Sequence, residues 1–289
     1  MNILVYVRQI LSPGELVEID KENKQVDDSR GRFQPHPTDE AEVEEAVRLK
    51  ETVADGQQGE GKVTVVCIGP ERTEQDLRAY LAVGADEAIR VWDDAFSDVR
   101  LDDSTLAVLL TKVAKSLTPD WILCGDDRFT SLAGYLSELL QQSAATAVRA
   151  IELDGPGVKV RRKLEKSTVT VEMSAPGILA VERGHTPRYP SHKDRLLAKK
   201  KTIAVLGSAD LPQSIDEITA LEKRLKIEAI TLPKPGKKNY PPGEDGFSRY
   251  VSLLLGGMAG GDTGGQVIEG STEKMADAAV EKIDSLGCI

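Results

Sequence analysis

Residues 63–91, VTVVCIGPERTEQDLRAYLAVGADEAIRV, contain the pattern that decides the fold. The stretch opens with a β-branched apolar run, 63–68, without polar alternation, which is typical of a parallel strand covered on both faces. Gly69 ends this run, apolar residues then recur at helical spacing as far as Gly84, and a second apolar run begins at Ala88. The order strand, helix, strand predicts a βαβ unit within an α/β fold.

The start of the helix in this unit carries a capping pattern. Thr73 is followed three residues later by Asp76, an acidic variant of the capping box, which predicts that Thr73 caps the helix. The preceding turn, Gly69–Glu71, lies at the carboxyl end of a strand and so faces the crevice in which open α/β sheets bind ligands. It matches neither G-x-G-x-x-G nor G-x-x-x-x-G-K-[ST], so it is not one of the familiar phosphate loops.

The composition predicts a packed aliphatic core and argues against nucleic-acid binding. Of the 289 residues, 40% are hydrophobic and only 4% are aromatic. The formal net charge is -10 and the sequence pI is near 5.0. A protein that binds a phosphate backbone needs clustered Lys and Arg, because its affinity comes largely from the release of counterions.

The cysteines and the amino terminus predict a cytoplasmic protein without direct membrane insertion. Cys67, Cys124 and Cys288 are widely separated and form no C-x-x-C, so neither a zinc site nor a dithiol redox motif is indicated. The first two lie at the ends of predicted buried strands, where cysteine acts as a small hydrophobe. The opening MNILVYVRQI has an apolar run too short for a signal peptide or a membrane span.

Other stretches predict further elements of the same α/β fold. Residues 12–37 alternate weakly and predict an exposed hairpin or excursion. The remaining predictions for this half of the chain are strands at 3–7 and 121–125, a helix capped by Thr38 or Asp39, and helices at 102–117 and 132–140.

Polar side chains stand at the carboxyl ends of two of these strands. Arg8 and Gln9 follow the first strand, and Gly125–Ser131 leads from another strand into a helix amino terminus. Backbone N–H groups and the helix dipole can bind an anion at such a place, so a nucleotide phosphate could lie there. A solvated strand end, and a plain βα loop capped by Thr130 or Ser131, are the alternatives that the pattern leaves open.

The pattern changes after residue 147. Four short runs without intervening helices predict antiparallel strands added to the sheet edge, at 150–153, 158–160, 168–171 and 178–181. A loop, 182–191, then leads into a basic run, 196–201, which stands out from an acidic chain and would suit a partner's acidic surface.

Beyond Val205 the composition predicts an arm. The expected pieces are a linker at 208–212, helices at 215–225, 247–255 and 272–286, and a Pro/Gly connection at 233–243 that cannot join the sheet. We therefore divide the chain into an α/β domain, residues 1–206, and a C-terminal arm, residues 207–289. An arm with so little core of its own needs another surface to rest on, which predicts a partner subunit.

Several stretches, in their order along the chain, resemble the β-subunit of electron-transfer flavoproteins, including its nitrogen-fixation-associated branch. They are ILVYVRQ (3–9), HPTDEAEVEEAVRLKE (36–51), the opening stretch (63–91), WILCG (121–125), TPRYPSHKDRLLAKKK (186–201) and VIEGSTEKMADAAVEKIDSLGCI (267–289). The resemblance covers nearly the whole chain.

The resemblance implies a Rossmann-like domain, similar to the adenine nucleotide alpha hydrolases, in a heterodimer with an α-subunit. The α-subunit would hold the redox-active FAD near the interface. The β-subunit would bind a second nucleotide, which is structural AMP in simple carriers and a bifurcating FAD in forms that also oxidise NADH. Electrons would pass from an acyl-CoA dehydrogenase or a similar flavin dehydrogenase to a quinone reductase, or the other way in anaerobes.

The resemblance also implies the residues of the nucleotide pocket. The matching positions are Tyr6, Val7, Arg8, His36, Thr38, Asp39, Cys67, Ile68, Gly69, Gly125, Asp126, Asp127, Thr130 and Ser131.

Two departures leave open whether the ligand is AMP, FAD or neither. The family usually has Asn-Pro-Phe or Asn-Pro-Tyr at His36–Thr38 and a small Ala at Tyr6. The loop after the strand 121–125 is several residues shorter than the family's loop. In it Asp126 and Asp127 repel a phosphate unless Arg128 or the helix dipole offsets them.

A second matching set belongs to the loop that docks on dehydrogenases, with Arg183, Arg188, Tyr189, Ser191, His192, Lys199 and Lys200. Where the carriers have Leu-Pro, this chain has His192-Lys193, so an apolar anchor has become polar or cationic. The change points to an unusual partner, although His192 could also be an ordinary surface residue. The retained Arg188 and Tyr189 favour the non-bifurcating members.

The leading hypothesis is therefore an electron-carrier subunit that positions a flavin and has no catalytic acid or base of its own, so its status as an enzyme stays open. The runner-up is a bifurcating complex with a second FAD and NADH in this subunit. A regulatory nucleotide-binding module without redox activity uses the same scaffold, so the fold alone does not exclude it. A stand-alone adenine-nucleotide hydrolase is a further alternative, and the lack of catalytic residues weighs against it.

Overall fold

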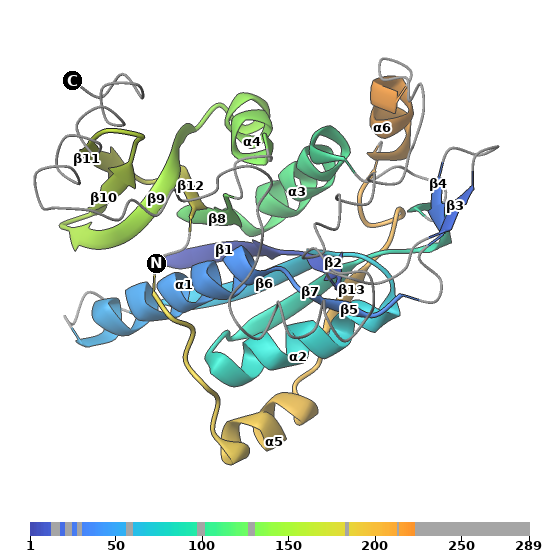
Figure 1. Ribbon diagram of the computed structural model, residues 1–289, viewed down its shortest axis with the longest axis horizontal. Helices are drawn as coiled ribbons and strands as arrows, with labels where there is room; N and C mark the ends of the chain where they lie inside the picture. The colour runs from blue at the N-terminus through green and yellow to red at the C-terminus, as the bar shows by residue number, and fades with distance from the viewer. Residues whose placement is uncertain are drawn as a thin grey trace, which may run out of the picture. The chain divides into compact units, whose positions relative to one another are not determined.

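The computed structural model describes residues 1–12, 18–20, 25–27, 31–55, 60–96, 102–126, 131–182, 185–212 and 214–222 (Figure 1). The chain divides into two units, residues 1–230 and 231–289, and all described residues belong to the first. The predicted connection at 233–243 and the predicted helices at 247–255 and 272–286 lie outside the described residues.

A nine-stranded sheet forms the centre of the described part, in the order β11-β10-β9-β12-β8-β1-β6-β7-β13. The parallel strands are β1 (Asn2–Val7), β6 (Lys62–Ile68), β7 (Glu87–Val91), β8 (Trp121–Gly125), β12 (Gly177–Val181) and β13 (Ala204–Leu206). At one edge, β9 (Ser143–Asp154), β10 (Gly157–Lys163) and β11 (Thr168–Ser174) are mutually antiparallel. The predicted fold class, an α/β sheet with antiparallel edge strands, is confirmed.

Helices cover both faces of this sheet (Figure 1). One face packs on α1 (Pro37–Asp55) and α2 (Glu74–Val83), and α5 (His192–Lys200) packs against α2. The other face packs on α3 (Asp103–Leu117) and α4 (Leu132–Leu140), and α6 (Ser214–Glu222) packs against α3. Neighbouring side chains of a strand point to opposite faces of the sheet. Alternate residues of β1 therefore pack in the apolar cores on the two faces, with Val5 facing α1 and Leu4 facing α3.

The predicted βαβ unit is present, but its capping box is wrong. A short 3-10 helix, η1 (Glu71–Thr73), precedes α2 and gives Thr73 a helical backbone with φ -70° and ψ -15°. A capping residue needs an extended backbone. The Thr73 hydroxyl instead donates to the carbonyl of Pro70 at 2.9 Å, and the Asp76 carboxylate accepts from Gln9 Nε2 at 2.7 Å.

The predicted cap of α1 is also wrong, because this helix begins at Pro37, ahead of Thr38 and Asp39. Proline suits the first helical position, since the N–H it lacks has no partner there. His36 takes the capping role: its carbonyl accepts from Asp39 N at 3.0 Å, and its Nδ1 accepts from Thr38 N at 3.3 Å. Thr38 and Asp39 are left to face the carboxyl ends of the strands.

One strand lies elsewhere than predicted. The run 178–181 was expected to be antiparallel at the edge, yet β12 is parallel and lies between β8 and β9. Every residue of β12 is buried, which fits a strand covered on both faces.

The excursion expected at 12–37 is confirmed where it is described. The strand β2 (Gln9–Leu11) pairs with β5 (Phe33–Pro35), and β3 (Glu18–Asp20) pairs with β4 (Gln25–Asp27), both antiparallel. Another 3-10 helix, η2 (Asp94–Phe96), follows β7.

The first part of the predicted arm packs on the α3 face. Leu211 and Ile218 are buried in the same apolar cluster as Leu109 and Leu110 of α3. The domain boundary at residues 206 and 207 stays a prediction. In the part of the chain described, no helix has both the length and the apolar content needed to cross a bilayer.

Gly84 offers a test of how α1 and α2 pack. It ends α2 with φ +126°, and an added Cβ would lie 2.9 Å from Val47 Cγ1 of α1. Gly84→Ala should lower the free energy of unfolding by about 1–3 kcal/mol in urea denaturation, because both backbone strain and crowding oppose it. Gly134→Ala is the control: that glycine lies inside α4 with no atom within 4 Å of its would-be Cβ. The Gly134→Ala variant should have a free energy of unfolding up to about 1 kcal/mol higher than the wild type, because alanine has the higher helix propensity. Equal effects of the two variants would contradict this packing.

Candidate functional site

The carboxyl ends of β1 and β8 meet the amino end of α1 and form the candidate site. Arg8 follows β1, Gly125 ends β8, and Thr38 and Asp39 lie in the first turn of α1. This edge is where open α/β sheets bind their ligands. The structure thus brings Gly125 together with predicted residues that are distant from it in the sequence, Arg8, Thr38 and Asp39.

The Arg8–Asp39 ion pair is at the centre of this site. Arg8 Nη2 donates to Asp39 Oδ1 at 2.9 Å, and Arg8 Nε donates to Asp39 Oδ2 at 3.2 Å. The backbone N–H of Arg8 donates to the same Oδ2 at 2.6 Å. The Asp39 side chain is 0% exposed and that of Arg8 is 15% exposed, so the pair is shielded from water. A charge buried this deeply depends on its partner.

Thr38 and His36 complete the hydrogen-bonded cluster around Arg8. Arg8 Nη2 lies 3.2 Å from Thr38 Oγ1 and 3.3 Å from His36 Nδ1. The Thr38 hydroxyl donates to Asp39 Oδ1 at 3.0 Å. His36 Nδ1 also lies 2.6 Å from Thr38 Oγ1, so the imidazole, the hydroxyl and the guanidinium are in mutual contact.

Gly125 lets this cluster lie directly against β8. An added Cβ would come within 2.8 Å of Asp39, Thr38 and Arg8 side-chain atoms. Any larger residue at this position would displace them.

The neighbouring predicted residues that are described, Asp126 and Ser131, make hydrogen bonds that hold the surrounding backbone in place. Asp126 N donates to the carbonyl of Val181 at 2.8 Å, and an oxygen of its carboxylate accepts from Ala147 N at 2.7 Å. Ser131 precedes α4 without capping it through its side chain, and its N–H donates to the Asp103 carboxylate. Asp127 and Thr130 lie outside the described residues.

The other predicted pocket residues are buried. Tyr6 lies on the α3 face and Val7 on the α1 face, while Cys67 and Ile68 end β6. Burial raises the pKa of the Cys67 thiol to about 12, against the effect of its hydrogen bond with Thr73, so the thiol is protonated at neutral pH. Gly69 N donates to the carbonyl of Val91 at 3.2 Å and so ties this turn to β7.

A buried acid that was not among the predicted site residues lies one turn after Asp39. Glu42 is 0% exposed, and neither oxygen of its carboxyl group has a hydrogen-bond partner in the described part of the chain. Burial, and then the charge of Asp39, raise the pKa of Glu42 well above its ordinary value, although Arg8 opposes this. The surroundings of Glu42 therefore favour its protonated form. The spacing of three residues from Asp39 was the available signal.

The segment 185–191 crosses α1 and contacts more of its acids, two of which are buried. Arg188 Nε and Nη2 donate to Glu44 at 2.9 and 3.0 Å, and Arg188 Nη1 donates to Glu51 at 2.6 Å. His185 is hydrogen-bonded to Glu45. These contacts join positions that are 137 to 144 residues apart, so no local pattern could reveal them.

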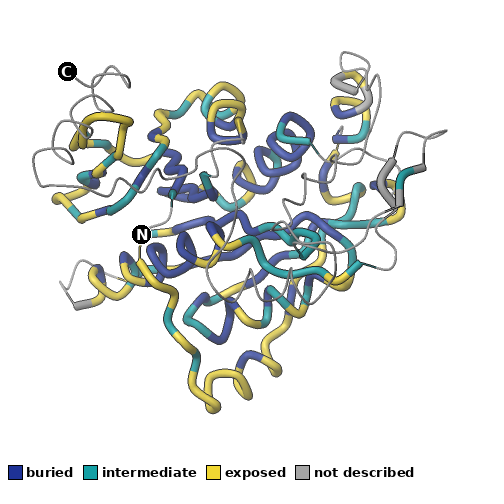
Figure 2. The backbone as a smooth tube through the Cα atoms, viewed as in Figure 1, coloured by how far each residue is buried: buried dark blue, intermediate teal, exposed yellow. Residues whose placement is uncertain are grey.

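The predicted docking residues that are described lie on this segment and on α5. Tyr189 is 86% exposed, and the Arg195 guanidinium lies 4.6 Å from its ring centre. Ser191 caps α5, accepting from Asp194 N at 3.2 Å. His192, Lys199 and Lys200 are exposed, as the tube in Figure 2 shows for most of α5. Arg183 lies outside the described residues.

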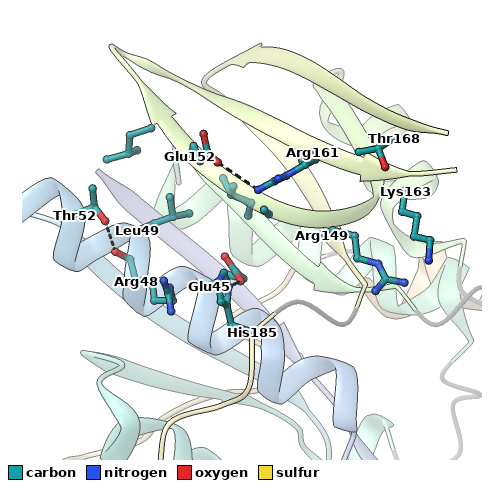
Figure 3. Close-up of a pocket in the computed structure, with 13 residues that line it drawn as sticks. Glu45, Arg48, Leu49, Thr52, Arg149, Glu152, Arg161, Lys163, Thr168 and His185 are labelled. Atoms are coloured by element: carbon teal, nitrogen blue, oxygen red, sulfur yellow. Dashed lines mark hydrogen bonds and ion pairs between the residues drawn. The ribbon is translucent and has the colours of Figure 1, made fainter.

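Two cavities lie away from the carboxyl edge. One, of about 720 Å³, lies between α1 and the antiparallel strands (Figure 3), where Arg161 faces Glu152 and Glu45 faces His185. The other, of about 700 Å³, lies between α2 and residues 187–199, and Tyr80 and Tyr189 help to line it. Among the described residues, no group of His, Cys, Asp and Glu is placed to hold a metal ion.

The fold and the site thus define a Rossmann-like α/β subunit with a polar cluster at its ligand edge. Residues 24–211 match the electron transfer flavoprotein domain family. The chain belongs to this family, which is associated with flavin.

Similar proteins carry the name electron transfer flavoprotein subunit beta. The protein from Methylophilus methylotrophus is 30% identical over 246 residues, 82% of this chain and 90% of that protein. The one from Thermoanaerobacterium thermosaccharolyticum is 33% identical over 239 residues, 81% of this chain and 88% of that protein. The one from Bacillus subtilis is 30% identical over 263 residues, 88% and 97% of the two chains.

The buried ion pair predicts a large loss of stability when one partner is removed. Asp39→Ala should lower the free energy of unfolding by about 3–5 kcal/mol, because Arg8 then stays buried without its counter-charge. The control is Glu87→Ala, which removes one partner of the Lys62–Glu87 pair, where both side chains are about half exposed. It should cost no more than about 1 kcal/mol. Urea denaturation of both variants checks this, and similar losses would contradict the assigned role.

Glu42 predicts a stability difference that grows with pH. In the unfolded chain Glu42 has a pKa of about 4.3. In the folded chain its pKa is higher, so the folded state is favoured less as pH rises above about 4.3, and the wild type loses stability. Glu42→Gln should match the wild type at about pH 4 and exceed its stability at about pH 8.

Glu44→Gln is the matched control on the same helix. Burial acts to raise the pKa of Glu44, but hydrogen bonds from Arg188 outweigh it and hold the pKa below the ordinary value. This variant should be less stable than the wild type at neutral pH, and the difference should vanish in acid. Denaturation midpoints measured across this pH range test both, and a Glu42→Gln difference independent of pH would refute the assignment.

Proposed function

We propose that this chain is the β-subunit of a heterodimeric electron transfer flavoprotein. It would carry electrons between a flavin dehydrogenase, such as an acyl-CoA dehydrogenase, and a quinone-reductase-type acceptor. The observation that carries the proposal is the long match to proteins named electron transfer flavoprotein subunit beta, which spans 90% of the Methylophilus methylotrophus protein. The redox chemistry belongs to FAD, held mainly by the α-subunit at the interface, and this chain's part is to position partners.

The segment 186–200 supports a docking role in this scheme. Arg188 fixes its start to α1, and Arg78 of α2 fixes its end by donating to the carbonyls of Ala198 and Lys199 at 3.3 and 3.2 Å. Between these two anchors the α5 helix exposes Leu196 and Leu197. A rigid element with exposed apolar and basic side chains, in an acidic protein, suits a partner with an acidic rim.

The carboxyl edge of the sheet does not support a second nucleotide in this subunit. The side chain that would bind its phosphate, Arg8, is already paired with Asp39. No step of the proposed function therefore passes through AMP or a bifurcating FAD here.

Co-expression with the α-subunit tests the proposal. The two chains should co-purify as a yellow complex that contains one flavin and takes up electrons from a reduced flavin dehydrogenase. The checks are gel filtration, visible absorbance and reduction kinetics under anaerobic conditions. A stable heterodimer without any flavin would contradict the electron-transfer role and favour a regulatory module. Two flavins for each heterodimer would favour bifurcation.

A further inference from the structure

The space in front of Gly125 is filled by the chain itself. A glycine at the carboxyl end of a parallel strand normally allows a ligand to approach the backbone closely. Here Arg8, Thr38 and Asp39 approach it instead, all within 2.8 Å of the position that a Cβ would take. A phosphate could reach this backbone only if those side chains moved away.

The cation at this edge is also fully engaged. Arg8 directs two nitrogens of its guanidinium at Asp39, and one of them also contacts Thr38. A bidentate arginine–carboxylate pair has the geometry with which arginine recognises phosphate, so the Asp39 carboxylate stands where a phosphate would bind. Asp39 belongs to the same chain and is completely buried, which gives it a large advantage over a free ligand.

The surrounding groups do not favour an added anion. Asp126 follows Gly125 directly, and the Asp39 carboxylate lies beside the same glycine. Burial raises the pKa of Tyr6, Cys67 and Cys124, and neighbouring acids raise each of them further. The electrostatic potential of these described acids therefore opposes a phosphate at this edge.

We propose that the Arg8–Asp39 ion pair takes the place of a nucleotide phosphate, so that this subunit binds no AMP, ADP or second FAD. The ion pair then does structurally what a bound phosphate would do, because it ties the carboxyl end of β1 to the amino end of α1. The inference rests on the proposed function for one point only, that the heterodimer carries an FAD at its interface.

Nucleotide analysis of the purified heterodimer tests the proposal. The complex of the full chain with its α-subunit is denatured in acid, and the released FAD, AMP and ADP are measured by liquid chromatography with mass spectrometry. We expect one FAD for each heterodimer and no AMP or ADP above a mock preparation. Isothermal titration of the same complex with AMP should show no binding up to about 1 mM, which excludes loss of the ligand during purification. AMP or ADP in equal amount to the heterodimer, or a second FAD, overturns the proposal.

A charge variant tests the cause. Asp39→Asn keeps the size of the side chain but removes the competing carboxylate, so Arg8 becomes available to a phosphate. We expect this variant to bind AMP in titrations in which the wild type does not. Asp76→Asn is the control, because Asp76 is another acid near this edge that hydrogen-bonds to Gln9 rather than to Arg8. It should stay free of nucleotide.

The outcomes separate the two proposals. If Asp39→Asn folds, as judged by circular dichroism, and still binds no AMP, the ion pair is not what excludes the phosphate. If that variant does not fold, the nucleotide content of the wild-type heterodimer still shows whether the subunit binds AMP, ADP or a second FAD. A heterodimer without FAD contradicts the proposed function, whereas one with both FAD and AMP contradicts only this inference.

Discussion

The structure depends most on a buried ion pair that joins the first strand to the first helix. β1 lies near the centre of the sheet, with β6 on one side and β8 on the other, and α1 covers it. Arg8 and Asp39 are 31 positions apart in the sequence, so the pair joins two segments that are not neighbours along the chain. The ion pair fixes the start of α1 over the carboxyl ends of β1 and β8. The cost of burying both charges is offset because Asp39 accepts three hydrogen bonds from Arg8 alone.

Helix α1 then positions the remaining functional surface. Its buried acids Glu44 and Glu45 are hydrogen-bonded to Arg188 and His185. These contacts hold the chain against α1 where it runs from the sheet towards α5. The ligand edge and the start of the docking segment 186–200 are therefore both fixed to α1, whereas Arg78 of α2 holds the end of that segment. Acidic residues are usually exposed to solvent. Here basic residues from distant parts of the chain pair with the acids of α1, so the helix can be buried and can position the site residues.

Much of the fold could be predicted from local patterns, because those patterns reflect local physics. Continuous apolar runs located the central strands, and the ends of α4 followed from the Gly-led turn before it and the apolar run within it. The placement of β12 could not be predicted, since strand order depends on pairing between distant segments. The site residues Arg8, Asp39 and Gly125 were identified by resemblance to the family, but their pairing with one another was not. The burial of Glu44 and Glu45 could not be predicted, because their partners Arg188 and His185 are 144 and 140 positions away in the sequence.

The central claim is that the ligand edge is closed by the protein's own ion pair, and an experimental structure of the heterodimer crystallised with excess AMP tests it most directly. The account predicts electron density for the Arg8 guanidinium against Gly125, with Arg8 Nη2 about 2.9 Å from Asp39 Oδ1 and no phosphate beside it. Density for a phosphate in contact with Arg8, with the Asp39 carboxylate turned away, would contradict the account.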